Sequence, residues 1–390
     1  MTDHLTAAGL TGLHAAAARH VAPDRVPGLA VLVASGEQVH VEALGTLSAG
    51  GLRPVRRDSL FRIASVTKPI TGAATLALVE EGLIGLHEPV DDLLPELARP
   101  RVLRQLDGPL TDTIPAARPI TTHDLLTFTF GFGAVTEMFM APEPWPIQAA
   151  VAELRLAAFG PPDPAHQPDP DTWLARFGSL PLLAQPGERW MYNTGACVLG
   201  VLLSRAAGQS FGEVLRTRIF EPLGMAATGF WTSHHDRLAE AYRATPAGLA
   251  VVDAPDGAWG RAPAFEDGAA GLVSTVDDLY AFARMLLGGG APVLAPESVA
   301  AMTVDQLTSE QKAHGGLGSD FFDHQSWSYC LAVQDTGAFG WDGGYGTSWL
   351  VDPARDLIVI AATQRLFASS ELPPAHRDIR AAAYAALATS

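Results

Sequence analysis

The residues of this chain whose spacing is suited to chemistry begin with Ser65 and Lys68, in the stretch FRIASVTK of residues 61–68. A serine hydroxyl is a weak nucleophile until a base takes its proton. If Ser65 lies in the first turn of a helix, Lys68 is one turn further on the same face, so its amine points at the hydroxyl. Free backbone N–H groups and the positive end of the helix dipole lie there too. The spacing therefore predicts an activated serine.

The use of lysine in this chain favours that prediction. The chain has 26 Lys and Arg residues, and only Lys68 and Lys312 are lysines. A guanidinium keeps its proton in a protein, whereas burial lowers the pKa of an amine until it can act as a base. The alternative is an N-capping serine followed by an unrelated lysine, because Ser-x-x-Lys is a weak motif by itself.

A second candidate follows Pro186-Gly187, in the segment WMYNTG of residues 190–195. Tyr192 is one of only six tyrosines. A phenol held near a lysine ammonium can lose its proton or relay one. The alternative is a tyrosine in an ordinary turn at an interface.

A third candidate is the glycine-rich segment FGWDGGYGTSW, residues 339–349, which leads into a late strand. Its glycines would let the backbone approach a substrate closely. A backbone N–H at this strand edge, together with that of Ser65, would form an oxyanion hole for acyl transfer. The alternative is a glycine-rich turn between two strands.

Length and composition allow one large domain or two, with a substantial core: 390 residues, 48% hydrophobic and 17% charged. The formal net charge of −16 argues against nucleic acid and anionic membranes as partners. Cys197 and Cys330 are too few for a disulfide framework. We see no signal peptide and no apolar run long enough to span a bilayer, so a cytoplasmic protein is expected.

The elements that must position these groups follow from hydrophobic pattern and turn residues. A helix is expected from Ser65 to Glu81, ending at Gly82. Eight prolines between residues 141 and 172 predict a long loop or lid there. The other predicted elements are helices over 4–20 and 373–388, a helix start at Thr122, and strands over 28–35, 38–44, 328–334, 347–352 and 357–363.

The simplest packing is an α+β fold. The first and last strands form one antiparallel β-sheet flanked by the terminal helices, and the mostly helical middle is inserted as a second lobe. We predict a discontinuous sheet domain, 1–64 plus 255–390, and a helical domain, 65–254, with a proline-rich lid at about 134–185. The active site would lie between them, where pockets commonly form.

Two further motifs are interpreted as structural. Residues 208–212, GQSFG, fit the Gly-x-Ser-x-Gly nucleophile elbow. They follow a helical run rather than a strand, and Ser210 with Glu213 fits a helix cap. His234-His235-Asp236 lacks the spacing of known metal motifs. No metal and no cofactor is predicted.

The three candidate motifs, in this order, resemble the serine β-lactamase and penicillin-binding-protein superfamily, in particular its class C-like branch and the family VIII carboxylesterases. The resemblance runs from about residue 25 to 365. It rests on six ordered phrases: LFRIASVTKPITGAATLALVEEG, LLTFTFGFG, PGERWMYNTGACVLG, FEPLGM, AAGLVSTVDDL and FGWDGGYGTSWLVDP.

The resemblance implies a role for each matching residue. Ser65 would be the acylated nucleophile, Lys68 would activate it, and Tyr192 would share the base role. The N–H groups of Ser65 and Gly344 would form the oxyanion hole. The residues expected to bind substrate are Trp341, Asp342, Gly343, Tyr345, Phe130, Phe132 and Thr194.

Four apolar residues near the proline-rich lid have two interpretations. They would either line an acyl pocket under the lid or belong to the core: Met138, Phe139, Met140 and Trp145.

Two departures from the superfamily pattern bear on the substrate. The Tyr-x-Asn motif appears as Tyr192-Asn193-Thr194, with the amide displaced by one position. Lys-Thr-Gly has become Trp341-Asp342-Gly343, which removes a cation for a substrate carboxylate and adds an anion. Restoration of the positive charge by Arg365 or another arginine stays open at this point. The expected function is a carboxylesterase for neutral, short or compact esters.

Other functions of the same fold stay open at this point. They are a β-lactamase, an acyltransferase, and a D-aminopeptidase or other amide hydrolase, in which Asp342 would receive a substrate amine. A non-catalytic binding protein is a different class, and the presence of Lys68 in a lysine-poor chain argues against it. The expected partner is a small-molecule ester or amide, and no oligomeric state is predicted.

Overall fold

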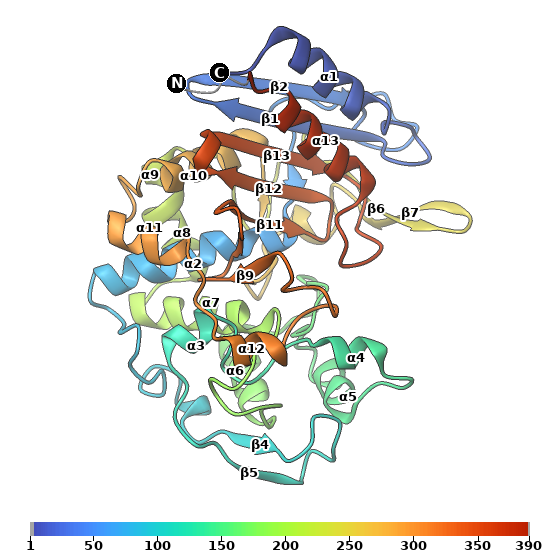
Figure 1. Ribbon diagram of the computed structural model, residues 1–390. Coiled ribbons are helices and arrows are strands. Elements are labelled where there is room, and N and C mark those ends of the chain that lie inside the picture. The colour runs from blue at the N-terminus through green and yellow to red at the C-terminus, as the bar shows by residue number, and fades with distance from the viewer. Residues whose placement is uncertain (1–3, 389–390) are drawn as a thin grey trace.

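The computed structural model describes residues 4–388 and contains a seven-stranded antiparallel sheet (Figure 1). Its strand order is β2-β1-β13-β12-β11-β10-β9. Strand β1 (Gly28–Ser35) pairs with β13 (Leu357–Thr363), in a register from Leu29↔Thr363 to Ser35↔Leu357. The first and last strands therefore share one antiparallel sheet, which confirms the predicted α+β fold.

The remaining elements follow the chain in order. The other strands are β2 (Gln38–Gly45), β3 (Phe61–Arg62), β4 (Arg101–Leu103), β5 (Thr113–Pro115), β6 (Ala241–Thr245), β7 (Gly248–Asp253), β8 (Val273–Ser274), β9 (Gln325–Trp327), β10 (Ala332–Gln334), β11 (Phe339–Gly343) and β12 (Thr347–Asp352). The α-helices are α1 (Ala7–Ala18), α2 (Thr67–Glu80), α3 (Thr122–Leu126), α4 (Thr136–Met140), α5 (Pro146–Glu153), α6 (Pro170–Gly178), α7 (Thr194–Ala207), α8 (Phe211–Leu215), α9 (Glu221–Leu223), α10 (Val276–Leu287), α11 (Pro296–Met302), α12 (Ser309–Ala313) and α13 (Pro374–Ala385).

Helices cover both faces of the sheet. Alternate residues of β1, such as Val31 and Val33, pack with α1 and α13 in one apolar cluster. The residues between them, such as Leu32, belong to the larger core on the opposite face, where α10 packs on β1, β12 and β13. Every residue of β1 and β13 is buried, which explains why these strands are continuous apolar runs in the sequence. Figure 1 shows the terminal helices lying together on the sheet, as predicted.

The proline-rich segment contains helices where a long loop was predicted. Helices α4, α5 and α6 lie within or beside residues 141–172. Pro146 and Pro170 occupy the first positions of α5 and α6. A helix accepts proline there because the N–H of that position has no intrahelical acceptor. The prediction of an irregular loop is therefore wrong at these places.

The strand predicted over 328–334 is interrupted by a turn. Strand β9 ends at Trp327, and β10 begins at Ala332. The Ser328 N–H donates to the Leu331 carbonyl at 2.8 Å, and Cys330 has a φ of 62°. The turn has neither Gly nor Pro, so the sequence gives no signal for it. The predicted domain limits, 1–64 plus 255–390 and 65–254, remain a prediction.

Among the helices of residues 4–388, none has both the length and the apolar character to cross a bilayer.

Burial of His376 in α13 makes stability depend on pH. Burial lowers its pKa to about 4, and its Nε2 lies 3.0 Å from the Gly346 carbonyl oxygen. The ordinary pKa of an imidazole is 6.5. As pH falls below this value, His376 binds a proton in the unfolded chain but stays neutral in the folded chain. We expect the contribution of His376 to the free energy of unfolding to be complete above pH 6.5 and to be lost as pH falls toward 4. The loss amounts to up to about 3 kcal/mol.

Urea unfolding of wild type and His376→Gln at pH 7 and pH 4.5 measures this contribution. The variant should lose less stability between the two pH values than wild type. Equal losses in both proteins would contradict the assignment, since carboxylates that titrate in this range are common to both.

Candidate active site

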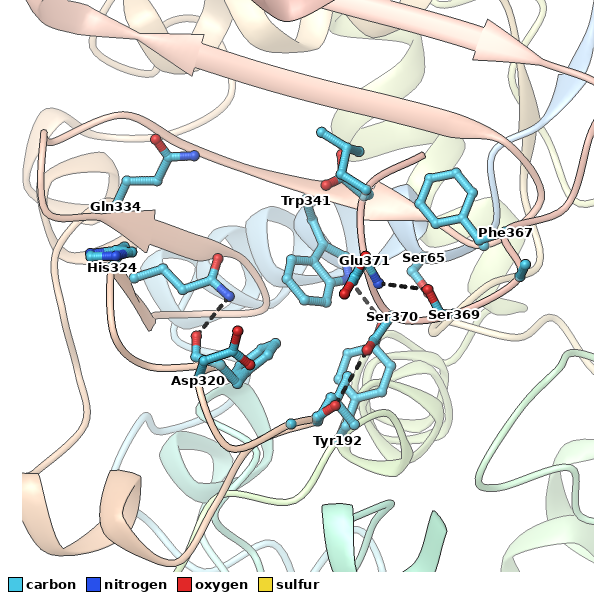
Figure 2. A pocket seen from close by; sticks show the side chains of 18 of the residues that line it. Ser65, Tyr192, Asp320, His324, Gln334, Trp341, Phe367, Ser369, Ser370 and Glu371 are labelled. Atoms are coloured by element: carbon cyan, nitrogen blue, oxygen red, sulfur yellow. Dashed lines mark hydrogen bonds between the residues drawn. The ribbon is translucent and has the colours of Figure 1, made fainter. Parts of the chain in front are cut away.

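Ser65 lines a cavity of about 990 Å³ (Figure 2). Its walls come from segments far apart in the sequence: the ends of the proline-rich region, the turn before α7, the loop 317–325, β11, and the segment after β13. Trp341, Tyr192 and Gly344 are among the lining residues. The fold therefore brings all three predicted motifs to one cavity.

Ser65 sits at a junction between a strand and a helix. Strand β3 pairs with β8, and the Ile63 N–H donates to the Leu272 carbonyl at 3.0 Å. Ala64 then has a φ of 43°, a left-handed conformation that costs an alanine about 1 kcal/mol. A single 3₁₀ turn, Ala64–Val66, carries Ser65 and continues into α2. The predicted place of Ser65 at a helix start is confirmed, with the first turn tighter than an α-helix.

Lys68 is in hydrogen-bond contact with the serine. Its Nζ lies 2.9 Å from Ser65 Oγ and 2.8 Å from the Ala269 carbonyl oxygen. The side chain is fully buried. An ammonium would donate to both oxygens, whereas a neutral amine would donate to Ala269 and accept the serine proton. The contact expected from the three-residue spacing is present.

Asp267 supports Lys68 and was not identified from the sequence. Its Oδ1 accepts a hydrogen bond from the Ala269 N–H at 2.8 Å and from Cys197 Sγ at 3.4 Å. The carboxyl is buried, which raises its pKa, and the charge of nearby Lys68 opposes that shift. Asp267 thus fixes the turn whose Ala269 carbonyl holds the amine. The hydrogen bond between Lys68 and Ala269 joins residues 201 positions apart, so no local spacing in the sequence predicts it.

Tyr192 stacks beside the lysine and is oriented by Trp341. The Lys68 Nζ lies 4.6 Å from the centre of the phenol ring. Trp341 Nε1 donates to the Tyr192 hydroxyl oxygen at 2.8 Å (Figure 2). Within residues 4–388, this indole is the hydroxyl's hydrogen-bond partner. Paired backbone hydrogen bonds to Ala134, at 2.8 and 2.9 Å, hold the backbone of Tyr192 in place.

The LTFTFGFG segment forms the support behind Tyr192 and does not line the cavity. Phe130 and Phe132 are fully buried, and both pack against Phe177. A Cβ on Gly133 would lie 2.5 Å from the Tyr192 carbonyl oxygen, so only glycine allows this approach. This corrects the expectation that Phe130 and Phe132 contact substrate, because core packing covers both rings.

Thr194 and Tyr345 also face away from the cavity. The Thr194 hydroxyl and the displaced amide of Asn193 both donate to the buried carbonyl of Ala158, each at 2.9 Å. Tyr345 is buried with its ring centre 5.2 Å from that of Trp259. The expectation of substrate contact is therefore corrected for both residues.

Asp342 lines the cavity and is neutralised by an ion pair. Its carboxylate pairs with Arg380 of α13. Arg380 also donates to Ser348 Oγ at 2.7 and 3.0 Å. Because Arg380 pairs with the carboxylate, its charge is balanced on the protein side. The expectations that Asp342 repels anions or receives a substrate amine stay predictions. Arg365 does not line this cavity and supplies no replacement for the missing lysine.

Among the four residues proposed for an acyl pocket under the lid, Phe139 is the one that lines the cavity. Met138 is buried in the core, Trp145 packs against it, and Met140 is exposed. The alternative interpretation as core therefore holds for Met138 and Trp145.

The two predicted oxyanion donors belong to backbone segments that approach each other closely. Strand β11 ends at Gly343, where a Cβ would lie 2.1 Å from the Ile63 carbonyl oxygen and 3.4 Å from the Ser65 nitrogen. Gly344 follows and lines the cavity, with open space around its Cα. Within residues 4–388, neither the Ser65 N–H nor the Gly344 N–H has a hydrogen-bond acceptor. Both are available to a developing oxyanion.

Ser210 has the structural role that was predicted for it. Its Oγ accepts from the Glu213 N–H at 3.2 Å and caps α8. Gly208 ends α7 in the left-handed conformation, with a φ of 63°. Neither residue lines the active-site cavity.

The contact between β11 and the Ser65 turn predicts different effects at two adjacent glycines. Gly343→Ala places a methyl group against the Ile63 carbonyl, so we expect a loss of stability of about 1–3 kcal/mol and displacement of Ser65. Gly344→Ala meets open space and keeps its N–H. Urea unfolding and ester hydrolysis measure both effects. Equal damage from the two substitutions would contradict the close approach.

The indole of Trp341 is expected to act by orienting Tyr192. Trp341→Phe removes the hydrogen bond, so kcat/KM should fall about tenfold, mainly through kcat. Trp327→Phe is the matched control, because its Nε1 has no hydrogen-bond partner in residues 4–388 and its ring packs 4.7 Å from that of Trp341. Steady-state kinetics and thermal midpoints separate the two effects. A similar kinetic loss in both variants would assign Trp341 to packing alone.

The chain is similar to known proteins over most of its length. The family model described as Beta-lactamase matches residues 13–384. The chain is 38% identical to Protein Rv1367c of Mycobacterium tuberculosis, over 80% of this chain and 79% of that protein. It is 31% identical to Esterase EstB of Burkholderia gladioli, over 88% and 86% respectively. The solved structure of EstCE1, described as a hydrolase with promiscuous acyltransferase activity, superimposes with a TM-score of 0.80 and 25% identity, over 96% of this chain and 98% of that one.

The two esterases place the chain near the family VIII branch, and its fold is that of the β-lactamases and transpeptidases. The matched family model covers nearly the whole length that carries the cavity and its three motifs. The chain belongs to the beta-lactamase family.

Proposed function

We propose that the protein is a serine carboxylesterase that forms an acyl-enzyme on Ser65. The observation that carries this proposal is the hydrogen bond of 2.9 Å between Ser65 Oγ and the buried Lys68 Nζ, at the wall of a cavity of about 990 Å³. A nucleophile paired with a base and open to a cavity is the minimum requirement for acyl transfer.

The first half of the proposed reaction acylates the serine. Ser65 Oγ attacks the ester carbonyl while its proton passes to Lys68 as a neutral amine, which becomes an ammonium. Where Tyr192 is a phenolate, the proton passes on to its oxygen. The carbonyl oxygen becomes an oxyanion and accepts hydrogen bonds from the N–H groups of Ser65 and Gly344. One such donor is typically worth about 10²–10³ in rate.

The second half releases the products. When the C–O bond to the leaving group breaks, Tyr192 or Lys68 returns the proton to the alkoxide, which departs as an alcohol. A water molecule, deprotonated by the same pair, then attacks the acyl carbonyl and frees Ser65. An alcohol in place of water would yield a new ester, which is an acyltransferase reaction of the kind ascribed to EstCE1.

The cavity suits neutral, compact acyl and alcohol groups. Phe139, Phe321 and Trp341 supply apolar surface. The charge of Asp342 is balanced by Arg380. Since Trp341 stands where the β-lactamases have their third-motif lysine, a β-lactam carboxylate meets an indole at that position instead of a cation.

A second candidate is an amide hydrolase for amine-bearing substrates. Asp320, Asp335 and Glu371 line the cavity, and in residues 4–388 none of them forms an ion pair. Their charges disfavour an anionic substrate and favour a cationic one. An ester or amide with a free amine is therefore the alternative substrate class.

Hydrolysis of p-nitrophenyl butyrate by wild type and Ser65→Ala tests the proposal. We expect Ser65→Ala to lose about 10⁴-fold or more in kcat. Ser210→Ala is the control, because Ser210 belongs to a helix cap. Intact mass after treatment with a fluorophosphonate should show one adduct on wild type and none on Ser65→Ala. Full turnover by Ser65→Ala would refute the role of this serine.

Parallel assays with a chromogenic cephalosporin and D-alanyl p-nitroanilide decide between the substrate classes. The cavity predicts ester turnover well above that of the cephalosporin. Faster turnover of the anilide than of the ester would favour the amide hydrolase.

A further inference from the structure

A second cavity, of about 430 Å³, adjoins the active-site cavity. Both are lined by Ala368, Ser369, Glu371 and Leu372. These residues belong to the segment 366–373, which connects β13 to α13 and which we call the strap. Figure 2 shows several strap side chains at the active-site cavity. The strap is therefore a wall common to the two cavities.

The second cavity concentrates positive charge. Arg25, Arg365 and Arg377 line it, and in the part of the chain that the structure describes none of them forms an ion pair. Glu371 is the acidic residue that opposes them there. The remaining cationic candidate, His20, is already bound to Asp378 at 2.6 Å. In a chain with a net charge of −16, this cluster is a local reversal of sign.

The start of α13 adds groups that favour an anion. Pro373 and Pro374 have no N–H, so the first free N–H groups belong to Ala375 and His376, and no side chain caps them. The His376 side chain lines the cavity and is 2% exposed. Its Nδ1 has no hydrogen-bond partner in residues 4–388. Because Nε2 faces the Gly346 carbonyl oxygen, it carries the ring proton and Nδ1 is an acceptor. The desolvation cost of Nδ1 is therefore relieved by a ligand O–H or a water, while the free N–H groups of the helix start face the anionic oxygens.

The size and apolar lining indicate more than an inorganic ion. A water molecule takes up about 30 Å³ in the liquid, far less than this cavity. Val26, Leu366 and Leu372 contribute apolar surface. A ligand with an anionic head and a short hydrocarbon body would satisfy both kinds of lining.

We propose that the second cavity binds a small organic anion, with a carboxylate or phosphate head held by the arginines, and that its occupancy alters ester turnover through the strap. The binding site goes beyond the proposed function, whereas the effect on turnover rests on it. Since the ligand and the substrate would touch the same strap residues, each would bias the conformation that the other meets.

Isothermal titration calorimetry of the full chain tests binding. Hexyl phosphate and hexanoate should bind saturably. Inorganic phosphate should bind at least about tenfold more weakly, and 1-hexanol should not bind.

The double variant Arg365→Gln/Arg377→Gln should lose about tenfold or more in affinity for hexyl phosphate. Arg243→Gln, at an exposed arginine of β6 outside both cavities, is the matched control. If the double variant does not fold, Arg25→Gln takes its place, because that side chain is exposed.

Two further readouts test the link to the active site. Hexyl phosphate should slow hydrogen exchange in residues 366–373 and change kcat/KM for p-nitrophenyl butyrate about fivefold, in wild type and not in the double variant. Equal affinity of wild type and double variant, or binding of 1-hexanol, would overturn the site. Binding without a change in exchange or turnover would overturn the link. If no ester is turned over, the proposed function fails, and calorimetry and exchange still decide on the second cavity.

Discussion

The structure depends on a lysine amine enclosed in the protein interior. An amine removed from water must regain its hydrogen bonds from the protein, or the fold carries the cost of desolvation. Lys68 has two such partners, Ser65 Oγ and the Ala269 carbonyl. Because the second partner is a backbone atom fixed by Asp267, the amine is directed at the serine. The contacts that make burial tolerable thus also set the geometry of the candidate nucleophile.

Two close approaches of backbone complete this arrangement. At Gly343 the end of β11 lies against the Ser65 turn, and at Gly133 the chain lies against Tyr192. Neither place has room for a Cβ, so contact with the neighbouring backbone requires glycine at both. Trp341, on the same strand as Gly343, donates a hydrogen bond to the Tyr192 hydroxyl. Strand β11 therefore touches both the Ser65 turn and the phenol of Tyr192, and couples their positions.

The electrostatic character of the cavity comes from α13 as well as from the motif itself. Asp342 is an anion that lines the cavity, and Arg380 of α13 pairs with it. The same helix begins at the second cavity, where Arg25, Arg365 and Arg377 gather around the other side of the strap. The chain end therefore balances charge in one cavity and concentrates it in the next. The charge around this cavity is a property of the packed sheet and its terminal helix together.

Prediction from the sequence failed where a side chain's surroundings depend on contacts with elements distant in the sequence. Phe130 and Phe132 are aromatic residues in a glycine-punctuated phrase, and only packing shows that core side chains cover them. Asn193 and Thr194 follow Tyr192 directly in the sequence. Their side chains nevertheless point into the protein, because both donate hydrogen bonds to the distant Ala158 carbonyl. The turn at Cys330 lies inside an apolar run without Gly or Pro, so the sequence did not predict it.

The sequence by itself determined the features that local spacing encodes. A three-residue step along a helix start brings Lys68 to Ser65, alternation and apolar runs define the sheet strands, and Ser210 with Glu213 forms a cap. Only the tertiary structure decided which side chains face the cavity, that Asp267 stands behind Lys68, and that Arg380 neutralises Asp342. Those outcomes depend on how long-range packing satisfies each buried polar group, and no local pattern of residues specifies which distant partner will do so.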